Sequence, residues 1–147
     1  MQSGDNKGFI HPWSKAAAAN WYQQKGWILG CNYAPAYAAN QLEMWEADTF
    51  DADAIDRELG WAEHLGFNSI RVFLHHLLWE HDAKGLLSRM DIFLSIAHRR
   101  HIGVMFVIFD GVWNPHPTVG KREYKPGVHN SGWLQSPGVE ILKDENK

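Results

Sequence analysis

Hydrophobic residues gather into three short runs, and longer amphipathic stretches separate these runs along the chain. The runs at 27–33, 67–74 and 102–109 lack a clear alternation of apolar and polar residues, which predicts strands buried on both faces. Apolar residues recur at near-helical spacing at 51–66 and 85–101, so a helix is expected in each of these segments. Alternating strands and helices are typical of right-handed parallel crossovers, and the pattern therefore predicts an α/β protein.

The remaining segments are expected to be less regular. The chain, 1–147, is interpreted as a single domain, with its three strands and two helices at 27–110. An N-terminal extension with a short helix that docks onto the rest of the domain is predicted at 1–26. The polar segment at 111–137 is rich in Gly, Pro, Asn and His and predicts a long loop, and a truncated helix is expected at 138–147. Residues 34–50 also read as a loop.

Composition narrows the classes of partner. The net charge is only −3 and no run of Lys and Arg occurs, so neither nucleic acid nor a membrane is expected as partner. A small neutral ligand such as a carbohydrate fits better. The polar start of the chain has no signal peptide and no apolar run could span a bilayer, which predicts a soluble protein. Cys31, the single cysteine, is expected to be a small buried hydrophobic residue.

Five motifs occur in a fixed order along the chain: GCNYAP at 30–35, NQLEMW at 40–45, GFNSIRVFLH at 66–75, MFVIFD at 105–110 and HNSGWLQSP at 129–137. Together they resemble the first three βα units of bacterial cellulase-like or xylanase-like glycoside hydrolases of the family-5 type. The resemblance covers roughly residues 20 to 140. It implies a (β/α)8 TIM barrel, which needs about 250 residues when complete. The chain is therefore predicted to be a truncated barrel of about three parallel strands with flanking helices, completed by oligomerisation.

The resemblance also implies a retaining glycosidase with two catalytic glutamates. One would follow an Asn at the end of the fourth strand, and the other would lie at the end of the seventh. The sequence has no Asn-Glu-Pro motif, so neither glutamate is expected in this chain. Retaining hydrolysis needs two carboxyl groups about 5 Å apart. Glycosidase activity is therefore expected to be weak or dependent on assembly, and a secreted or periplasmic location is compatible with the family.

Four residues are candidates for catalysis. Arg71 lies inside the second predicted strand, and the resemblance implies that it points into the top of the barrel and bonds the nucleophile. His75, Asp110 and His129 are expected at strand ends or in the long loop on the same face. His75, Asp110 and His129, with His116, are also candidate ligands for a divalent metal, because imidazole and carboxylate suit ions such as Zn²⁺. No cofactor is expected to be required.

A second set of residues is predicted to bind substrate, because exposed aromatic rings grip the faces of sugars and polar side chains bond their hydroxyl groups. Several tryptophans lie in segments that read as loops, where they are either sugar-binding rings or ordinary buried anchors. The set is Asn32, Glu43, Trp45, Trp79, Trp113, Asn130 and Trp133.

Three parallel strands alone would leave two open sheet edges and an uncovered apolar face. Such edges are association sites, and exposing apolar surface costs about 25 cal/mol per Å². The apolar strands at 70–74 and 104–109 therefore predict a homodimer or homotetramer.

Two alternative functions stay open at the level of sequence. One is a repurposed hydrolase such as an esterase, which would use a metal or would pair Ser131 or Ser136 with His129 as base. The other is a non-catalytic module that binds glycans. No Gly-x-Ser-x-Gly elbow supports the serine hydrolase, and glycan binding without turnover would support the binding module.

Overall fold

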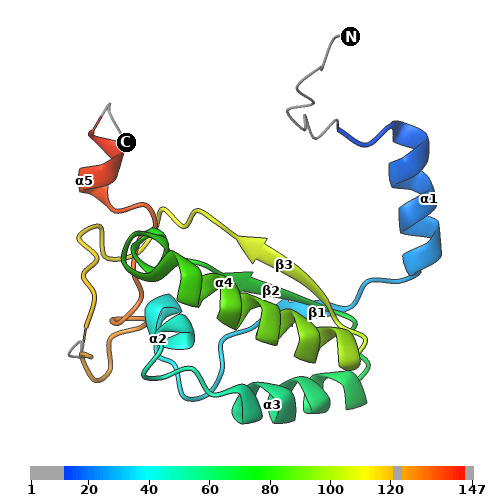
Figure 1. Ribbon diagram of the computed structural model, residues 1–147, viewed down its shortest axis with the longest axis horizontal. Coiled ribbons are helices and arrows are strands. Elements are labelled where there is room, and N and C mark those ends of the chain that lie inside the picture. The colour runs from blue at the N-terminus through cyan, green and yellow to red at the C-terminus, as the bar shows by residue number, and fades with distance from the viewer. Residues whose placement is uncertain (1–11, 121–123, 145–147) are drawn as a thin grey trace, which may run out of the picture.

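The computed structural model describes residues 12–120 and 124–144, which form a small α/β domain (Figure 1). Three parallel strands, β1 (Gly30–Asn32), β2 (Ser69–Phe73) and β3 (Gly103–Val107), lie in the order β1-β2-β3. The parallel pairing places Arg71 between Asn32 on one neighbouring strand and Met105 on the other. The predicted α/β class, with three parallel strands and flanking helices, is confirmed.

Helices α3 (Ala52–His64) and α4 (His76–Arg99) cover one face of the sheet (Figure 1). Asp51 begins α3 as its N-cap, and its carboxylate accepts a hydrogen bond of 2.9 Å from the Ala54 N–H. The apolar side chains of α3 and α4 that face the sheet are buried in one hydrophobic core. Helix α3 agrees with the predicted helix, whereas α4 begins nine residues before the expected start at Gly85.

The extra length of α4 comes from a short helical segment that joins the main helix at a kink. Asp82 has non-helical backbone angles inside α4 (φ −151°, ψ 58°). Its carboxylate accepts a hydrogen bond from the Gly85 N–H at 3.0 Å and pairs with the Arg89 guanidinium at 2.8 Å. Asp82 therefore caps the longer part of α4 just as an N-cap residue would cap a separate helix.

Burial alternates along β2, so the prediction of strands buried on both faces is wrong for the described residues. Ile70 and Val72 are buried toward the helices, whereas Arg71 between them is exposed. Side chains point alternately to the two faces of a sheet, and among the described residues only the helical face is covered. The uncovered side is named the open face. Cys31 is exposed as well, because it lies on the edge strand β1, whose three residues are all exposed.

Helix α2 (Gln41–Trp45) occupies part of the segment predicted to be a loop, so that prediction is wrong here. The Asn40 side chain caps it by accepting hydrogen bonds of 2.9 Å from the Leu42 and Glu43 N–H groups. The Trp45 ring is fully buried against Phe93, with ring centroids 5.2 Å apart. Its indole N–H donates to the Phe73 carbonyl at 2.9 Å, which fixes α2 against the end of β2.

Two helices lie at the ends of the described chain. Helix α1 (Lys15–Lys25) has no buried residue and stands away from the sheet in Figure 1, so the expectation that it docks is not met. Helix α5 (Val139–Leu142) begins where a helix was predicted. None of the described helices is long and apolar enough to cross a membrane.

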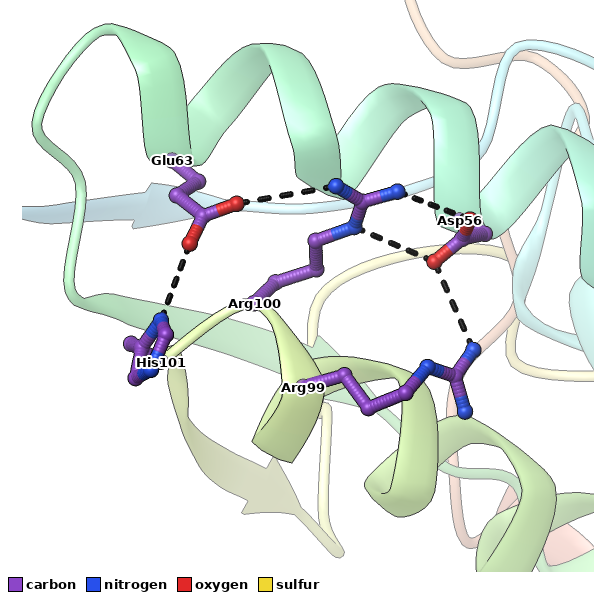
Figure 2. Close-up of polar contacts among 5 residues, drawn as sticks. All are labelled: Asp56, Glu63, Arg99, Arg100 and His101. Atoms are coloured by element: carbon purple, nitrogen blue, oxygen red, sulfur yellow. Dashed lines mark hydrogen bonds and ion pairs between the residues drawn. The ribbon is translucent and has the colours of Figure 1, made fainter.

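A network of charged side chains ties α3 to the end of α4 (Figure 2). The Arg100 guanidinium lies between two acids of α3, at 2.8 Å from Asp56 and 3.6 Å from Glu63. Arg99 also pairs with Asp56, and His101 pairs with Glu63 at 2.9 Å. Hydrogen bonding from Arg100 holds the pKa of Asp56 below its ordinary value, so these contacts favour its ionised form.

Candidate functional site at the carboxyl edge of the sheet

The strands point toward α2 and toward the long segment after β3 (Figure 1). In open parallel sheets, ligands bind beyond the carboxyl ends of the strands. Residues that were selected for function from the sequence lie at this edge: Asn32 ends β1, His75 follows β2 and Asp110 follows β3. The edge is therefore the first place to look for a site.

Arg71 lies on the open face of β2 in a fixed position. Its Nη1 group donates a hydrogen bond of 3.3 Å to the Asn32 Oδ1 atom of the neighbouring strand. Its Cζ atom lies 4.7 Å from the centroid of the Phe73 ring, as in a cation–π contact. Residues 71 and 73 share this face because side chains alternate along a strand. No described carboxylate forms an ion pair with Arg71, in contrast to Arg89, Arg99 and Arg100.

A chain of aromatic rings continues from Phe73 into the segment after β3. The Trp133 ring meets Phe73 edge to face, with centroids 5.4 Å apart, and Trp113 lies 6.1 Å from Trp133. These three rings are partly exposed, and the exposed His129 lies 6.3 Å beyond Trp113. The group formed by Asn32, Arg71, Phe73, Trp113 and Trp133 is named the carboxyl-edge site.

Asp110 positions one of these rings. Its Oδ2 atom accepts a hydrogen bond of 3.0 Å from the Trp113 indole N–H and one of 3.4 Å from the Gln41 amide. The backbone of Asp110 also pairs antiparallel with Ser136. Gln41 is buried and bonds both the N–H and the carbonyl of Leu134. Asp110 thus joins β3, α2 and the returning segment, and it orients Trp113.

Tyr33 closes the first strand and connects it to α3. Its hydroxyl donates a hydrogen bond of 2.9 Å to the Glu58 carboxylate. Burial, together with this hydrogen bond, raises the pKa of Tyr33 above its ordinary value, so the phenol stays a donor. The hydrogen bond between Tyr33 and Glu58 lies on the helical side of the sheet, and it holds the end of β1 against α3.

His75 is buried and begins α4 as its N-cap. Its Nδ1 atom accepts from the Leu77 N–H at 3.2 Å, and its Nε2 atom lies 3.0 Å from the Gln135 carbonyl. The tautomer with the proton on Nε2 satisfies both contacts, because Nδ1 then accepts and Nε2 donates. In this structure His75 holds the start of α4 to the segment that returns from β3, and its catalytic role stays a prediction.

A contact between a serine and a histidine forms at this edge, although not with the predicted partner. The Ser136 hydroxyl lies 3.4 Å from His76 Nδ1 and accepts a hydrogen bond of 3.0 Å from the His76 N–H. The predicted pairing of this serine with His129 is therefore wrong among the contacts of the described residues. Ser136 is only 1% exposed, which keeps substrates from its hydroxyl. Ser131 instead accepts from the Lys125 N–H at 2.9 Å within a turn.

The candidate metal ligands are not gathered at one point. His116 pairs with Glu140 at 3.5 Å on an exposed surface, His75 is a buried cap, and Asp110 serves Trp113 and Gln41. Across residues 12–120 and 124–144, no group of three or more His, Cys, Asp or Glu side chains is placed to hold a metal ion. The divalent metal therefore stays a prediction without geometric support.

The remaining predicted substrate-binding residues occupy different environments. The Glu43 carboxylate accepts from the Ala39 N–H at 2.9 Å and from the Tyr124 hydroxyl. Asn130 has a left-handed backbone (φ 49°) and its carbonyl accepts from the Trp133 N–H at 3.0 Å, so it shapes the turn that presents Trp133.

Two predicted loop tryptophans lie on helices, so their assignment to loops is wrong. The ring of Trp45 belongs to the hydrophobic core and offers no surface to a ligand in this structure. Trp79 is exposed on α4. Both segments lacked a run long enough to reveal a helix, because α2 has only five residues and the kink at Asp82 breaks the periodicity of α4.

Sequence analysis missed three residues at this edge. The Phe73 ring lies under the Arg71 guanidinium. The Gln41 amide donates hydrogen bonds to Asp110 and to the Leu134 carbonyl, and the Tyr124 hydroxyl donates one to Glu43. Strand alternation from Arg71 was a signal for Phe73. The other two depend on contacts between segments more than 60 residues apart, and no local pattern announces them.

A pocket of about 540 Å³ lies at the opposite end of the sheet. Its lining includes Trp21 and Lys25 of α1, Asn68, His101 and Met105. This end carries the amino termini of β2 and β3, where parallel sheets seldom bind ligands. This pocket is the alternative place on the described structure where a ligand could bind.

No family model, characterised protein or solved structure matched the chain. Function is therefore argued from the sequence motifs and from the geometry of the carboxyl-edge site.

Proposed function

We propose that the chain is a carbohydrate-active module of glycoside hydrolase type, built on part of a (β/α)8 barrel, and that its carboxyl-edge site binds a sugar. One observation carries this proposal. An exposed, fixed arginine on the open face is continuous with two partly exposed tryptophan rings at the carboxyl edge. The motif resemblance agrees with it, because barrel enzymes bind substrate at this edge.

The chemistry of the carboxyl-edge site suits a sugar. A pyranose ring has an apolar face that packs on an aromatic ring and a rim of hydroxyl groups that accept and donate hydrogen bonds. Trp133 and Trp113 offer the aromatic faces. The guanidinium of Arg71 and the amide of Asn32 offer polar groups held in fixed positions.

Hydrolysis by these residues alone is proposed to be weak or dependent on assembly. A retaining glycosidase needs two carboxyl groups on opposite sides of the scissile bond, about 5 Å apart. Asp110 is committed to Trp113 and Gln41, and Glu43 is committed to Ala39 and Tyr124. Binding is therefore the activity that the described residues support best.

A titration of cello-oligosaccharides and xylo-oligosaccharides by calorimetry tests the binding proposal. The Trp133→Ala variant should bind the preferred sugar about tenfold more weakly, which corresponds to about 1.4 kcal/mol. Trp61→Ala is the matched control, because Trp61 is 60% exposed on α3, on the helical side of the sheet. No binding by the unaltered chain, or equal losses in both variants, would contradict the proposal.

The hydrolase alternative uses a metal or a histidine, and the contact between Ser136 and His76 is the serine–histidine pair nearest to it, although Ser136 is only 1% exposed. An aryl ester assay with and without a chelator separates it from sugar binding. Binding alone predicts no turnover above background in either condition. Turnover that disappears on chelation, or in His75→Ala, His76→Ala or His129→Ala, would favour the alternative.

We also propose that the chain associates with itself along the edge strand β3. The strand β3 is an edge strand of the described sheet, and large apolar side chains on it and just beyond it are exposed, including Met105, Ile108 and Phe109. Unpaired backbone groups and apolar side chains together make such an edge prone to pairing. A homodimer or homotetramer would cover them.

A further inference from the structure

The charge of Arg71 indicates which sugars the carboxyl-edge site prefers. We propose that this site selects sugars that carry a carboxylate, the uronic acids, and that the Arg71 guanidinium binds the carboxylate. This inference rests on the proposed function, since it names the substrate class of the same site.

The Arg71 guanidinium has N–H donors that no described residue uses. Arginine has five N–H donors, and Arg71 uses Nη1 for Asn32 while no other described residue accepts from it. The arginines at 89, 99 and 100 are all paired with carboxylates. In a chain whose net charge is −3, an exposed arginine without an acidic partner among the described residues leaves a cation available to a ligand.

The Arg71 side chain is held in place by its neighbours before a ligand arrives. The Asn32 amide and the Phe73 ring hold the guanidinium from two directions. A side chain that is fixed before binding loses less conformational freedom when the ligand arrives. Arginine presents a planar fork that matches a carboxylate with two parallel hydrogen bonds, so a fixed fork favours a planar anion over a hydroxyl group.

Aromatic rings lie next to the Arg71 guanidinium. Phe73 lies under the guanidinium, and the Trp133 ring meets Phe73 at 5.4 Å. A sugar ring placed on Trp133 therefore puts a substituent near Arg71. Two acids at this edge, Asp110 and Glu43, would repel a carboxylate. The Asp110 Oδ2 atom accepts hydrogen bonds from Trp113 and Gln41, and the Glu43 carboxylate accepts from Ala39 and Tyr124.

Trigalacturonate and triglucuronate, each compared with its fully methyl-esterified form, provide the test. Esterification removes the charge and keeps the sugar. In calorimetry at low salt, the unaltered chain should bind one of the acids about tenfold or more tightly than its ester, as expected for hydrogen bonds between charged groups. In Arg71→Gln the affinity for the acid should fall to that for the ester.

Arg57→Gln is the matched control. Arg57 is also exposed and lies 5.7 Å from the centroid of an aromatic ring, that of Trp61 on α3, so the substitution removes the same charge from the other side of the sheet. It should leave the preference for the acid unchanged. Thermal unfolding of both variants verifies that neither has lost the fold.

The possible results separate the inference from the proposed function. Equal affinity for acid and ester, with both sugars bound, would overturn the inference and leave sugar binding intact. A preference for the acid that survives in Arg71→Gln would overturn it too. Acetate that competes as well as the sugar acid would reduce the site to a general anion site, and binding of neither sugar form would remove both proposals.

Discussion

The tryptophans show how much a residue's role depends on what lies next to it. Trp45 and Trp133 both read as candidates for sugar binding from the sequence. The Trp45 ring is buried in the core and its indole N–H bonds the Phe73 carbonyl, whereas Trp133 is partly exposed beside the Phe73 ring. Two tryptophans that contact the same residue thus differ in environment, which suits Trp45 to stability and Trp133 to binding.

Replacement of Trp45 by alanine should be strongly destabilising. The substitution empties a fully buried site and removes the bond to Phe73, so the free energy of unfolding should fall by about 3–5 kcal/mol. Urea denaturation followed by far-UV circular dichroism measures it. Trp61→Ala should change the value by less than about 0.5 kcal/mol, because surface substitutions usually do. Similar losses in the two variants would show that Trp45 is not part of the core.

The pair of Asp56 and Arg100 should stabilise the fold in a manner that depends on pH (Figure 2). Arg100 lowers the pKa of Asp56 in the folded chain from the ordinary value of 3.8. A lowered folded pKa contributes stability that is complete above the unfolded pKa and is lost as the pH falls below it. Because both side chains are about one-third exposed, solvent screens the pair and its contribution should be small.

A comparison of the unaltered chain with Asp56→Asn by urea denaturation checks this dependence. The difference in the free energy of unfolding should be present at neutral pH, shrink below about pH 4 and decrease with added salt. A difference that is constant across this range would exclude the ionised pair as its source.

At the residue scale, sequence analysis identified Arg71 because a charged residue inside an apolar strand is unusual. Its partner Asn32 was also selected. The burial of Trp45 could not be predicted, because it depends on how a five-residue helix packs against the end of a strand 28 residues away.

The elements show where local signals are sufficient. Helix α3 has a clear N-cap at Asp51 and a glycine in a left-handed conformation just beyond its end, Gly66 (φ 87°), and both its ends agree closely with the prediction. Helix α4 has a histidine as its N-cap and a kink at Asp82, and neither feature is a usual start signal. Its expected start was therefore placed nine residues too late.

The kink predicts a coupling between Asp82 and Gly85. A methyl group added at Gly85 would meet the Asp82 carboxylate, so Gly85→Ala should displace the cap while it gains the helix propensity of alanine. The loss of the cap and the gain in helix propensity are each worth about 1 kcal/mol. In a chain that keeps Asp82, Gly85→Ala should therefore leave the free energy of unfolding nearly unchanged. In an Asp82→Ala background only the gain remains, and Gly85→Ala should stabilise by about 1 kcal/mol.

A double-mutant cycle measured by chemical denaturation tests this coupling. The expected sign is a more favourable effect of Gly85→Ala when Asp82 is absent. Additive effects of the two substitutions would mean that the Asp82 carboxylate does not cap the helix in solution.

For the whole molecule, the apolar runs of the strands are compatible with two arrangements, one in which both sides of the sheet are covered and one in which a single side is covered. The uninterrupted apolar runs predicted strands covered on both sides, yet the described residues cover one side only. The runs reflect apolar side chains such as Met105 that point to the open face. Periodicity indicates that a face is apolar and does not indicate what covers it. The uncovered apolar face was expected from the number of strands instead, because three parallel strands cannot close a barrel.

Self-association along β3 should respond to single charges. Met105→Glu or Phe109→Glu should shift the sedimentation of the chain toward the monomer, because each puts a charge where an apolar side chain is 60% or 71% exposed. Leu65→Glu is the control, since Leu65 is 70% exposed at the end of α3. A chain that sediments as a monomer at micromolar concentration and unfolds cooperatively would contradict the proposal.

The central claim is that a sugar binds at the carboxyl-edge site, and the indole N–H signals of the eight tryptophans test it most directly. In a titration with the preferred oligosaccharide followed by ¹H–¹⁵N NMR, the signals of Trp133 and Trp113 should move in proportion to occupancy. The signal of Trp61 on the helical side and that of Trp21 at the pocket by the amino end of the sheet should stay in place. Movement of Trp21 without movement of Trp133 and Trp113 would place the ligand at the opposite end of the sheet and contradict the claim.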